Sequence, residues 1–260
     1  MIYTEKYRRI LHRLGYYDYQ HGLIYRHLNQ DGGWDRHLEL CRNYILKAVD
    51  HFKPESVTIL GSGWLLDLPL AELVEKTQKV ILVDIIHPPA VASQVAGFQK
   101  VAIIEDDVTG GLINEVWTKT GKYGFFRKMK SLSEISIPEY IPEFDPGLVI
   151  SLNLLTQMET LLLDHIKKKS KVKEDELDVF RKEIQEKHLC FLSKFKSVMI
   201  TDVEEIFTGK NGSVKVIPTL RADIPEGALM EEWTWNFDLK GSDYYNNTSV
   251  MKVMAITFGS

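Results

Sequence analysis

Two stretches decide the fold class of this chain: Val57-Thr58-Ile59-Leu60-Gly61-Ser62-Gly63-Trp64-Leu65-Leu66-Asp67, and then Lys79-Val80-Ile81-Leu82-Val83-Asp84. An apolar run breaks into Gly-x-Gly, a helical pattern follows, and a second apolar run ends on an acid about 20 residues after the glycines. Glycine lets the backbone turn sharply and approach a ligand, and a carboxylate at the tip of the next strand can accept both ribose hydroxyls. The layout predicts a nucleotide-binding βαβ unit.

The pattern continues as alternating strands and helices. Apolar runs predict strands at 57–61, 80–84, 101–105, 147–152 and 197–202, and helical patterns lie near 64–77, 89–96, 156–168 and 174–194. Such near-continuous apolar runs are typical of strands that are buried on both faces. The last segments, 214–220, 232–239 and 250–258, are strand-like and are separated by turn residues. We therefore expect an α/β fold with a doubly wound, mostly parallel sheet and a C-terminal antiparallel strand pair.

The N-terminal part differs from this pattern, because apolar residues recur there at helical spacing up to about residue 52. Turn residues at 29–33 divide it, and Pro54 ends its last helix before the first strand. We predict a helical cap over 1–53 and a nucleotide-binding domain over 54–260. Residues 112–143 show no pattern that assigns them.

Composition limits the partners of this chain. Its 260 residues carry a formal net charge of −4, which offers no general attraction to nucleic acid or to anionic membranes. No apolar stretch is long enough to span a bilayer, and the N-terminus is too charged for a secretory signal, so a cytoplasmic location is expected. Cys41 and Cys190 lie far apart, and the histidines show no metal-ligand spacing, so no metal site is predicted.

Taken together, the glycine loop, the acid after it and the C-terminal strands resemble the class I S-adenosylmethionine-dependent methyltransferases. The resemblance covers about residues 55–260, and it implies that S-adenosylmethionine is the cofactor. In that family the Gly-x-Gly loop passes under the methionine part, which Gly61, Ser62 and Gly63 match. An acid at the end of the second strand holds the ribose, and Asp84 stands there.

The resemblance also implies roles for residues after the third and fourth strands. An acid and a small apolar neighbour flank the adenine in that family, which points to Asp107 and Val108. The fourth strand ends beside the sulfonium, often with an Asn, and Asn153 follows that strand here. One position departs from the pattern: Ile59 stands where the family usually has an acid, and Asp67 could take over its role towards the amino group of the cofactor.

Each of these residues also has a purely structural interpretation. A tight turn between strand and helix needs glycine without any ligand, and Asp107 could be a solvated loop acid. Asn153 could cap the next helix, and Asp67 could be an acid favoured at a helix start. Trp233 and Trp235 alternate on one strand and share a face, for which core packing is the default and a substrate platform the alternative.

Two other functions compete with methyl transfer. A nicotinamide-dependent oxidoreductase uses a similar loop and acid, but its full fingerprint would place glycine where Leu66 stands. A non-catalytic module that binds S-adenosylmethionine is the second alternative. The methyl acceptor is not identified by the sequence; we favour a small molecule, and the sequence gives no indication of nucleic acid.

Overall fold

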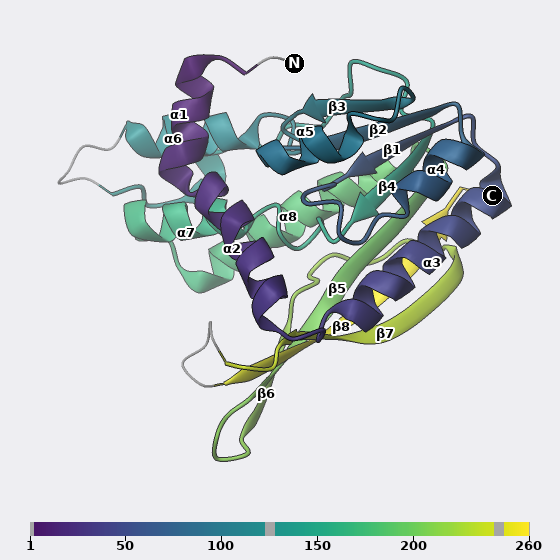
Figure 1. Ribbon diagram of the computed structural model, residues 1–260. Helices are drawn as coiled ribbons and strands as arrows, with labels where there is room; N and C mark the ends of the chain where they lie inside the picture. The colour runs from purple at the N-terminus through teal and green to yellow at the C-terminus, as the bar shows by residue number, and fades with distance from the viewer. Residues whose placement is uncertain (1–2, 123–127, 242–246, 260) are drawn as a thin grey trace.

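An eight-stranded sheet forms the centre of the computed structural model, which describes residues 3–122, 128–241 and 247–259. The strands are β1 (Ser56–Leu60), β2 (Lys79–Asp84), β3 (Val101–Glu105), β4 (Leu148–Leu152), β5 (Ser197–Thr208), β6 (Val214–Pro218), β7 (Ala228–Asp238) and β8 (Thr248–Phe258). Their order is β3-β2-β1-β4-β5-β8-β7, and β6 pairs with the outer half of β5 (Figure 1). The first five are parallel, whereas β8, β7 and β6 pair antiparallel. The predicted α/β fold with a C-terminal antiparallel pair is confirmed, and this is the Rossmann-like arrangement that the resemblance implies.

The helices lie on both sides of this sheet. They are α1 (Glu5–Leu14), α2 (Tyr16–Asn29), α3 (Asp35–Phe52), α4 (Leu70–Lys76), α5 (Pro89–Val95), α6 (Leu112–Gly121), α7 (Thr160–Lys169) and α8 (Glu174–Leu192), with a short 3₁₀ turn at Leu132–Glu134. At the start of α1, the Thr4 side chain accepts a hydrogen bond from the Tyr7 N–H. Gly15, with φ of 89°, ends α1 in the left-handed conformation and lets α2 leave in a new direction.

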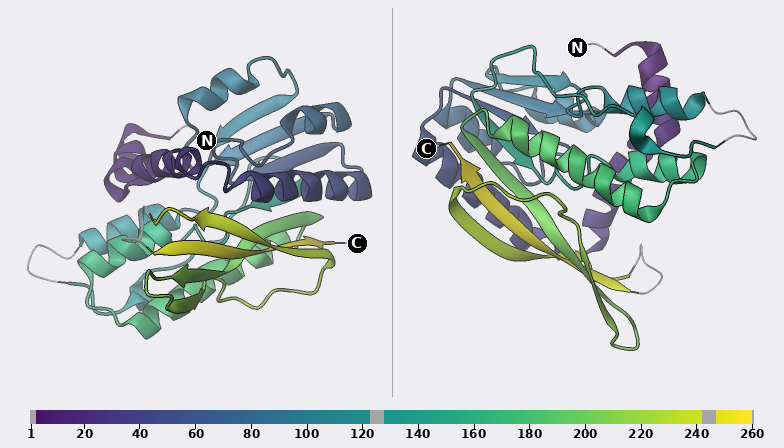
Figure 2. Two further views of the ribbon diagram at one scale, coloured as in Figure 1. Left: turned by 60° about the horizontal axis from the view of Figure 1, so that its bottom comes forward. Right: turned by 180° about the vertical axis from the view of Figure 1, so that it is seen from behind.

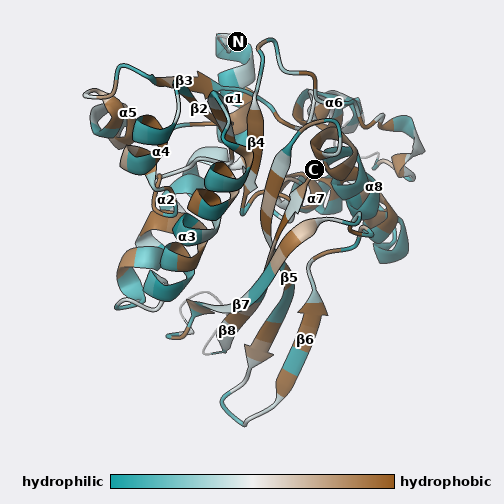
Figure 3. Ribbon diagram, turned by 90° about the vertical axis from the view of Figure 1, so that its right-hand side faces the viewer, coloured by the Kyte–Doolittle hydropathy of each residue, from teal (hydrophilic) through white to brown (hydrophobic). Residues whose placement is uncertain are grey.

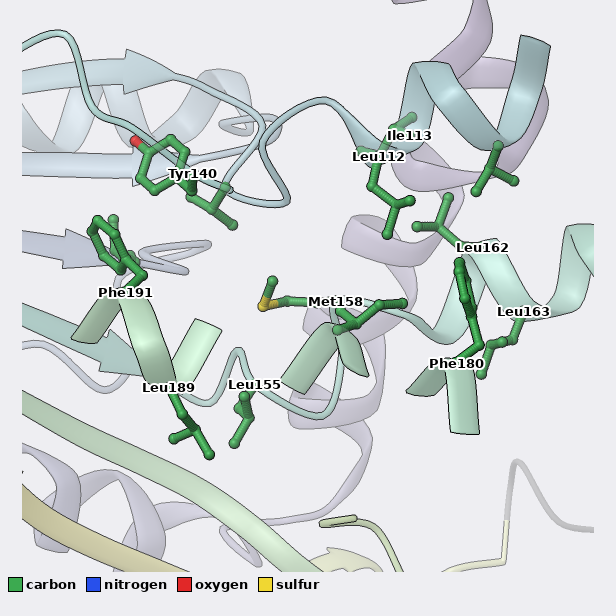
Figure 4. Close-up of a cluster of buried hydrophobic side chains, with 14 of the residues drawn as sticks. Leu112, Ile113, Tyr140, Leu155, Met158, Leu162, Leu163, Phe180, Leu189 and Phe191 are labelled. Carbon is green, nitrogen blue, oxygen red and sulfur yellow. The ribbon is translucent and has the colours of Figure 1, made fainter. Parts of the chain in front are cut away.

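Alternate residues of the parallel strands face two separate cores. Val57 and Ile59 of β1 pack with α3, α4 and α5, whereas Leu60 packs with α1, α6, α7 and α8. Figure 4 shows the second core, where Met158 and Phe191 lie among leucines from α6, α7 and α8. Figure 3 shows hydrophobic residues concentrated along the central strands. Seen from behind, α8 crosses the face of the sheet opposite to α3 (Figure 2).

The first two helices have a different position from the rest. α1 and α2 run past the carboxyl ends of the parallel strands, towards which the arrows point in Figure 1. α3 instead lies against the sheet, where Tyr44, Ile45 and Val49 are buried in the core that it shares with β7 and β8. The predicted cap over 1–53 thus contains one helix that covers a face of the sheet, and the domain boundary stays a prediction.

Two helices begin later than predicted. The helix predicted from residue 64 begins only at Leu70, because Pro69 disfavours helical backbone at Leu68 and Leu65 has a φ of 62°. The helix predicted from residue 156 begins at Thr160. Within the unassigned segment 112–143, α6 covers the start and residues 123–127 lie outside the described part. Among the described helices, none has the length and apolar character needed to cross a membrane.

Candidate active site

A pocket lies at the carboxyl ends of β1, β2 and β4, where α2 passes over them. All eight residues predicted for cofactor binding line it: Gly61, Ser62, Gly63, Asp67, Asp84, Asp107, Val108 and Asn153. Side chains from α2, α3 and β7 complete the lining, among them Gln20, His37 and Trp235. The structure therefore brings the predicted residues to one place and adds a part of the pocket that the sequence patterns did not indicate.

Gly61 and Gly63 of the loop have different surroundings. Gly61 has a φ of 81°, and a Cβ there would lie 2.8 Å from the carbonyl oxygen of Leu152, so packing against β4 excludes a side chain. Gly63 has a φ of 44°, and a Cβ would meet no atom closer than 3.9 Å. The structural interpretation of the loop thus accounts for Gly61, whereas the open space beside Gly63 remains available to a ligand.

Asp84 at the end of β2 is held by hydrogen bonds from the glycine loop and from α2. Its Oδ2 accepts a hydrogen bond from the Gly63 N–H at 2.8 Å, and its Oδ1 accepts one from Gln20 Nε2 of α2 at 3.2 Å. The side chain is buried, and this desolvation raises its pKa to about 6 although the hydrogen bonds act in the opposite direction. A carboxylate has about four acceptor positions, so it can take further hydroxyl donors.

Asp107 after β3 is buried and is not a solvated loop acid. The Tyr7 hydroxyl of α1 donates to its Oδ2 at 2.8 Å, and the Thr109 N–H donates to its Oδ1 at 3.0 Å. Burial raises the pKa of this carboxyl above its ordinary value. Val108 beside it is almost fully buried and lines the same pocket. Residues of the N-terminal helices therefore contact both Asp84 and Asp107.

Asp67 and Asn153 contact each other, and neither has the structural role that was its alternative. Asp67 is not at a helix start, because α4 begins three residues later, and Asn153 caps no helix, because α7 begins at Thr160. Asn153 Nδ2 donates to Asp67 Oδ2 at 2.8 Å, and desolvation raises the pKa of Asp67. Asn153 has a φ of 47°, in the left-handed region that asparagine adopts more readily than other residues with a side chain.

His37 of α3 lies next to Asp67 and Asn153. Its Nε2 lies 3.2 Å from Asn153 Nδ2 and 3.5 Å from Cys41 Sγ, and the ligand atoms of His37, Cys41 and Asp67 all lie within 4.8 Å of one another. That spacing would suit a metal, yet the Trp233 indole N–H donates to His37 Nδ1 at 3.0 Å. Because an indole is only a donor, the proton of the neutral ring is on Nε2, which then has no lone pair for a metal. In this tautomer Nε2 can donate to Cys41 Sγ, and it makes no hydrogen bond to the amide nitrogen of Asn153, which is also a donor. We describe these residues as a hydrogen-bonded cluster.

Aromatic side chains continue the pocket away from the glycine loop. His37 stacks on Trp235 with ring centroids 4.0 Å apart and 5° between the planes, and Trp34 meets Trp235 edge to face at 4.8 Å. We call Trp34, His37 and Trp235 the aromatic wall. The alternation of Trp233 and Trp235 correctly placed both indoles on one face, but no local pattern indicated that Trp34 and His37 of the cap pack against them.

The charged side chains among the described residues that line the pocket are all acidic. Among the described residues that line it are three carboxylates, Asp67, Asp84 and Asp107, and no lysine or arginine. Burial lowers the pKa of His37 to about 3, so this histidine is neutral near pH 7. Ser62 of the loop contacts His87 Nε2 at 2.8 Å, and burial lowers the pKa of His87 to about 4. The arrangement favours a cationic ligand.

Comparisons with known proteins give structural likeness alone. No protein-family model and no curated protein sequence matches the chain. A 1,6-didemethyltoxoflavin-N1-methyltransferase from Burkholderia thailandensis matches at 10% identity, covering 100% of this chain and 92% of that one, with a TM-score of 0.43. The DhpI–SAH complex matches at 10% identity, covering 96% and 98%, with a TM-score of 0.36.

A third solved structure matches with a similar identity and TM-score. The N-methyltransferase NodS from Bradyrhizobium japonicum, in complex with S-adenosyl-L-homocysteine, is 9% identical, with 85% of this chain and 87% of that one covered and a TM-score of 0.34. At such identities and TM-scores these likenesses do not establish what the present chain binds, and the residues of its own pocket have to indicate the ligand.

Proposed function

We propose that this chain binds S-adenosylmethionine in the pocket and transfers its methyl group to a small-molecule acceptor. One observation carries the proposal. The residues that the resemblance assigns to the methionine, ribose and adenine parts come from four separate segments of the chain, yet all of them line a single pocket. The parallel strands bring these segments to one edge of the sheet, the edge at which folds of this kind bind ligands.

The proposed assignments follow the order of the strands. Asp84 takes the ribose hydroxyls, and Asp107 with Val108 takes the adenine. The loop of Gly61, Ser62 and Gly63 lies under the methionine part, and Asp67 with Asn153 takes its amino group. The buried Asn153 Oδ1 and Gln20 Oε1 have no hydrogen-bond partner among the described residues, and both belong to residues of the lining. A ligand that donates hydrogen bonds would satisfy such atoms.

The charges of the lining also fit this cofactor. S-adenosylmethionine carries a positive sulfonium and a positive amino group, and the three carboxylates of the lining face no lysine or arginine within it. When bound, the cofactor supplies an electrophilic methyl group, so the protein has to orient the acceptor and exclude water. α2 contributes to that exclusion: Gln20 reaches Asp84, and Trp64 Nε1 donates to the Gln20 carbonyl at 2.8 Å.

Calorimetry tests the cofactor assignment. We expect S-adenosylhomocysteine to bind to the purified chain and NAD to bind far more weakly or not at all. The variant Asp84→Ala is expected to lose at least about tenfold in affinity, since a hydrogen bond to a charged group is worth about 1.5–3 kcal/mol. Tight NAD binding, or an unchanged affinity in Asp84→Ala, would contradict the assignment. Transfer of a labelled methyl group to any acceptor separates an enzyme from a non-catalytic binding module.

A further inference from the structure

The aromatic wall lies next to the residues proposed for the amino end of the methionine. His37 belongs to both, because its Nε2 lies 3.2 Å from Asn153 Nδ2 while its ring stacks on Trp235 at 4.0 Å. Leu23 of α2 and Leu38 of α3 also line the pocket together with the wall. A molecule that enters beside the cofactor therefore meets a lining of aromatic and aliphatic side chains, whose rings are largely buried against one another.

No cationic side chain is among the described residues that line this part of the pocket. None of the described lining residues is a lysine or an arginine, and Asp67 lies at the edge of the wall through its hydrogen bond to Asn153. A carboxylate or phosphate placed there would lose its hydration without a cation in the lining, because Arg42, which bonds the Leu66 carbonyl, and Arg26, which lies over the Phe237 ring, are both outside it. It would also be repelled by an ionised Asp67. His37 does not offset this, since its ring is buried and neutral.

One polar group of the wall has no partner. The Trp235 indole N–H is buried and makes no hydrogen bond to any described residue, whereas the Trp233 N–H donates to His37. An indole N–H can only donate, so its complement is an acceptor atom such as a ring nitrogen or a carbonyl oxygen. Buried polar groups without a partner are uncommon in proteins and call for an explanation, which a bound ligand would supply.

From these observations we infer that the methyl acceptor is an uncharged, planar heteroaromatic small molecule that packs against Trp34, His37 and Trp235. This inference rests on the proposed function, because it takes the glycine-loop half of the pocket for the cofactor. It specifies the acceptor class and sets aside acceptors that present a carboxylate or a phosphate to the wall, nucleic acids among them.

Matched pairs of small probes test the inference. Quinoline, indole and pteridine, each with its ring carboxylate, are titrated by calorimetry into the full chain saturated with S-adenosylhomocysteine. We expect at least one neutral ring to bind, and its carboxylate to bind at least about tenfold more weakly. Carboxylates that bind as tightly as the neutral rings, or no detectable binding of any neutral ring, would overturn the inference.

Two arginine substitutions in α2, one inside the pocket lining and one outside it, form a matched pair of variants. Leu23→Arg adds a cation to the lining, whereas Leu28→Arg adds the same cation to an exposed position of the same helix, outside the lining. We expect Leu23→Arg to raise the affinity for the carboxylate probes and Leu28→Arg to leave it unchanged. Equal effects of the two variants would show that the preference comes from the overall charge and not from the pocket.

The cofactor measurement keeps the two proposals apart. If S-adenosylhomocysteine binds to the chain but each carboxylate probe binds as tightly as its neutral ring, the acceptor inference fails and the proposed cofactor site stands. If S-adenosylhomocysteine does not bind, the proposed function itself fails.

Discussion

Asp84 accepts hydrogen bonds from the backbone of the glycine loop and from Gln20, and burial raises its pKa to about 6. The carboxylate accepts hydroxyl donors best when it is ionised, so its ionisation and ligand binding are linked. Above its pKa the proposed ribose site is charged, and as the pH falls through about 6 the site takes up a proton and loses acceptor positions.

The first prediction uses this linkage. The affinity for 5′-methylthioadenosine, which carries the ribose and the adenine without the amino acid end, is expected to fall as the pH decreases through about 6. Calorimetry over a series of pH values measures it. In Asp84→Asn the side chain cannot titrate, so affinity should be low throughout and the pH dependence should disappear. A persistent slope in that variant would assign the effect to another group, such as Asp107.

The second prediction concerns Asp67 and its hydrogen bond to Asn153. If Asp67 binds the amino group of the cofactor, Asp67→Asn should weaken S-adenosylhomocysteine by about tenfold or more, since hydrogen bonds to charged groups contribute about 1.5–3 kcal/mol. Binding of 5′-methylthioadenosine should change much less. Calorimetry with both ligands on one preparation provides the comparison, and equal losses would show that Asp67 only supports the loop.

At the scale of elements, the loop between β1 and α4 contacts the ends of two neighbouring strands. The Gly61 N–H donates to the Val83 carbonyl of β2 at 2.9 Å, and a Cβ on Gly61 would collide with the end of β4. Gly63 points its N–H at Asp84 and has free space around its Cα. Gly61 is therefore required for packing of the loop, whereas Gly63 has a proposed role in ligand binding.

A third prediction follows for the pair Gly61→Ala and Gly63→Ala. Gly61→Ala combines a left-handed φ with a contact of 2.8 Å to a carbonyl oxygen, so its unfolding free energy should fall by about 2 kcal/mol or more. Gly63→Ala has the space but still a positive φ, and should lose about 1–2 kcal/mol. Urea denaturation measures both. A larger loss in Gly63→Ala than in Gly61→Ala would contradict the described loop geometry.

The fourth prediction concerns the contact between α1 and the strand ends. Tyr7→Phe removes the hydroxyl that donates to Asp107, which should lower the free energy of unfolding by about 1–3 kcal/mol because the carboxylate loses a partner. Tyr3→Phe is a matched control, since the Tyr3 hydroxyl is buried without a hydrogen-bond partner among the described residues. Its removal should be neutral or stabilising. Thermal and urea denaturation compare the two, and equal losses would argue against the Asp107 contact.

At the scale of the whole molecule, the N-terminal segment serves both the pocket and the core. α1 and α2 bring Tyr7 and Gln20 to the carboxylates, whereas α3 buries Cys41, Tyr44 and Ile45 against the sheet. A cap that could be removed without loss would lack such a buried face.

The fifth prediction tests this point. A truncated chain of residues 54–260, which follows the predicted domain boundary, would expose the face of the sheet that α3 covers. We expect it to lack a cooperative thermal transition, because burial of that apolar surface is a main source of stability. Near-UV circular dichroism during heating measures the transition. A sharp transition in the truncated chain would show that 54–260 is an independent domain.

The local sequence determined the strands, the glycine loop and the acid at the end of β2. The apolar run of Val80–Val83 lies in the cores on both faces of the sheet, as a buried parallel strand requires, and Asp84 ends that strand as predicted. These features depend on residues that are close in sequence, so their periodicity and turn chemistry can be read directly. The start of α4 was missed although Pro69 marks it.

The tertiary structure alone decided which side chains meet. Tyr7 and Asp107 are 100 positions apart, Asn153 and His37 are 116 apart, and Trp233 and His37 are 196 apart. No local pattern records such pairs, because the contact depends on how α1, α2 and α3 pack against a sheet built from later residues. The contact between Asn153 and Asp67 likewise joins residues 86 positions apart. The sequence by itself thus determined the fold and the proposed cofactor residues, and packing between distant segments decided the aromatic wall and the hydrogen bonds that hold those residues in place.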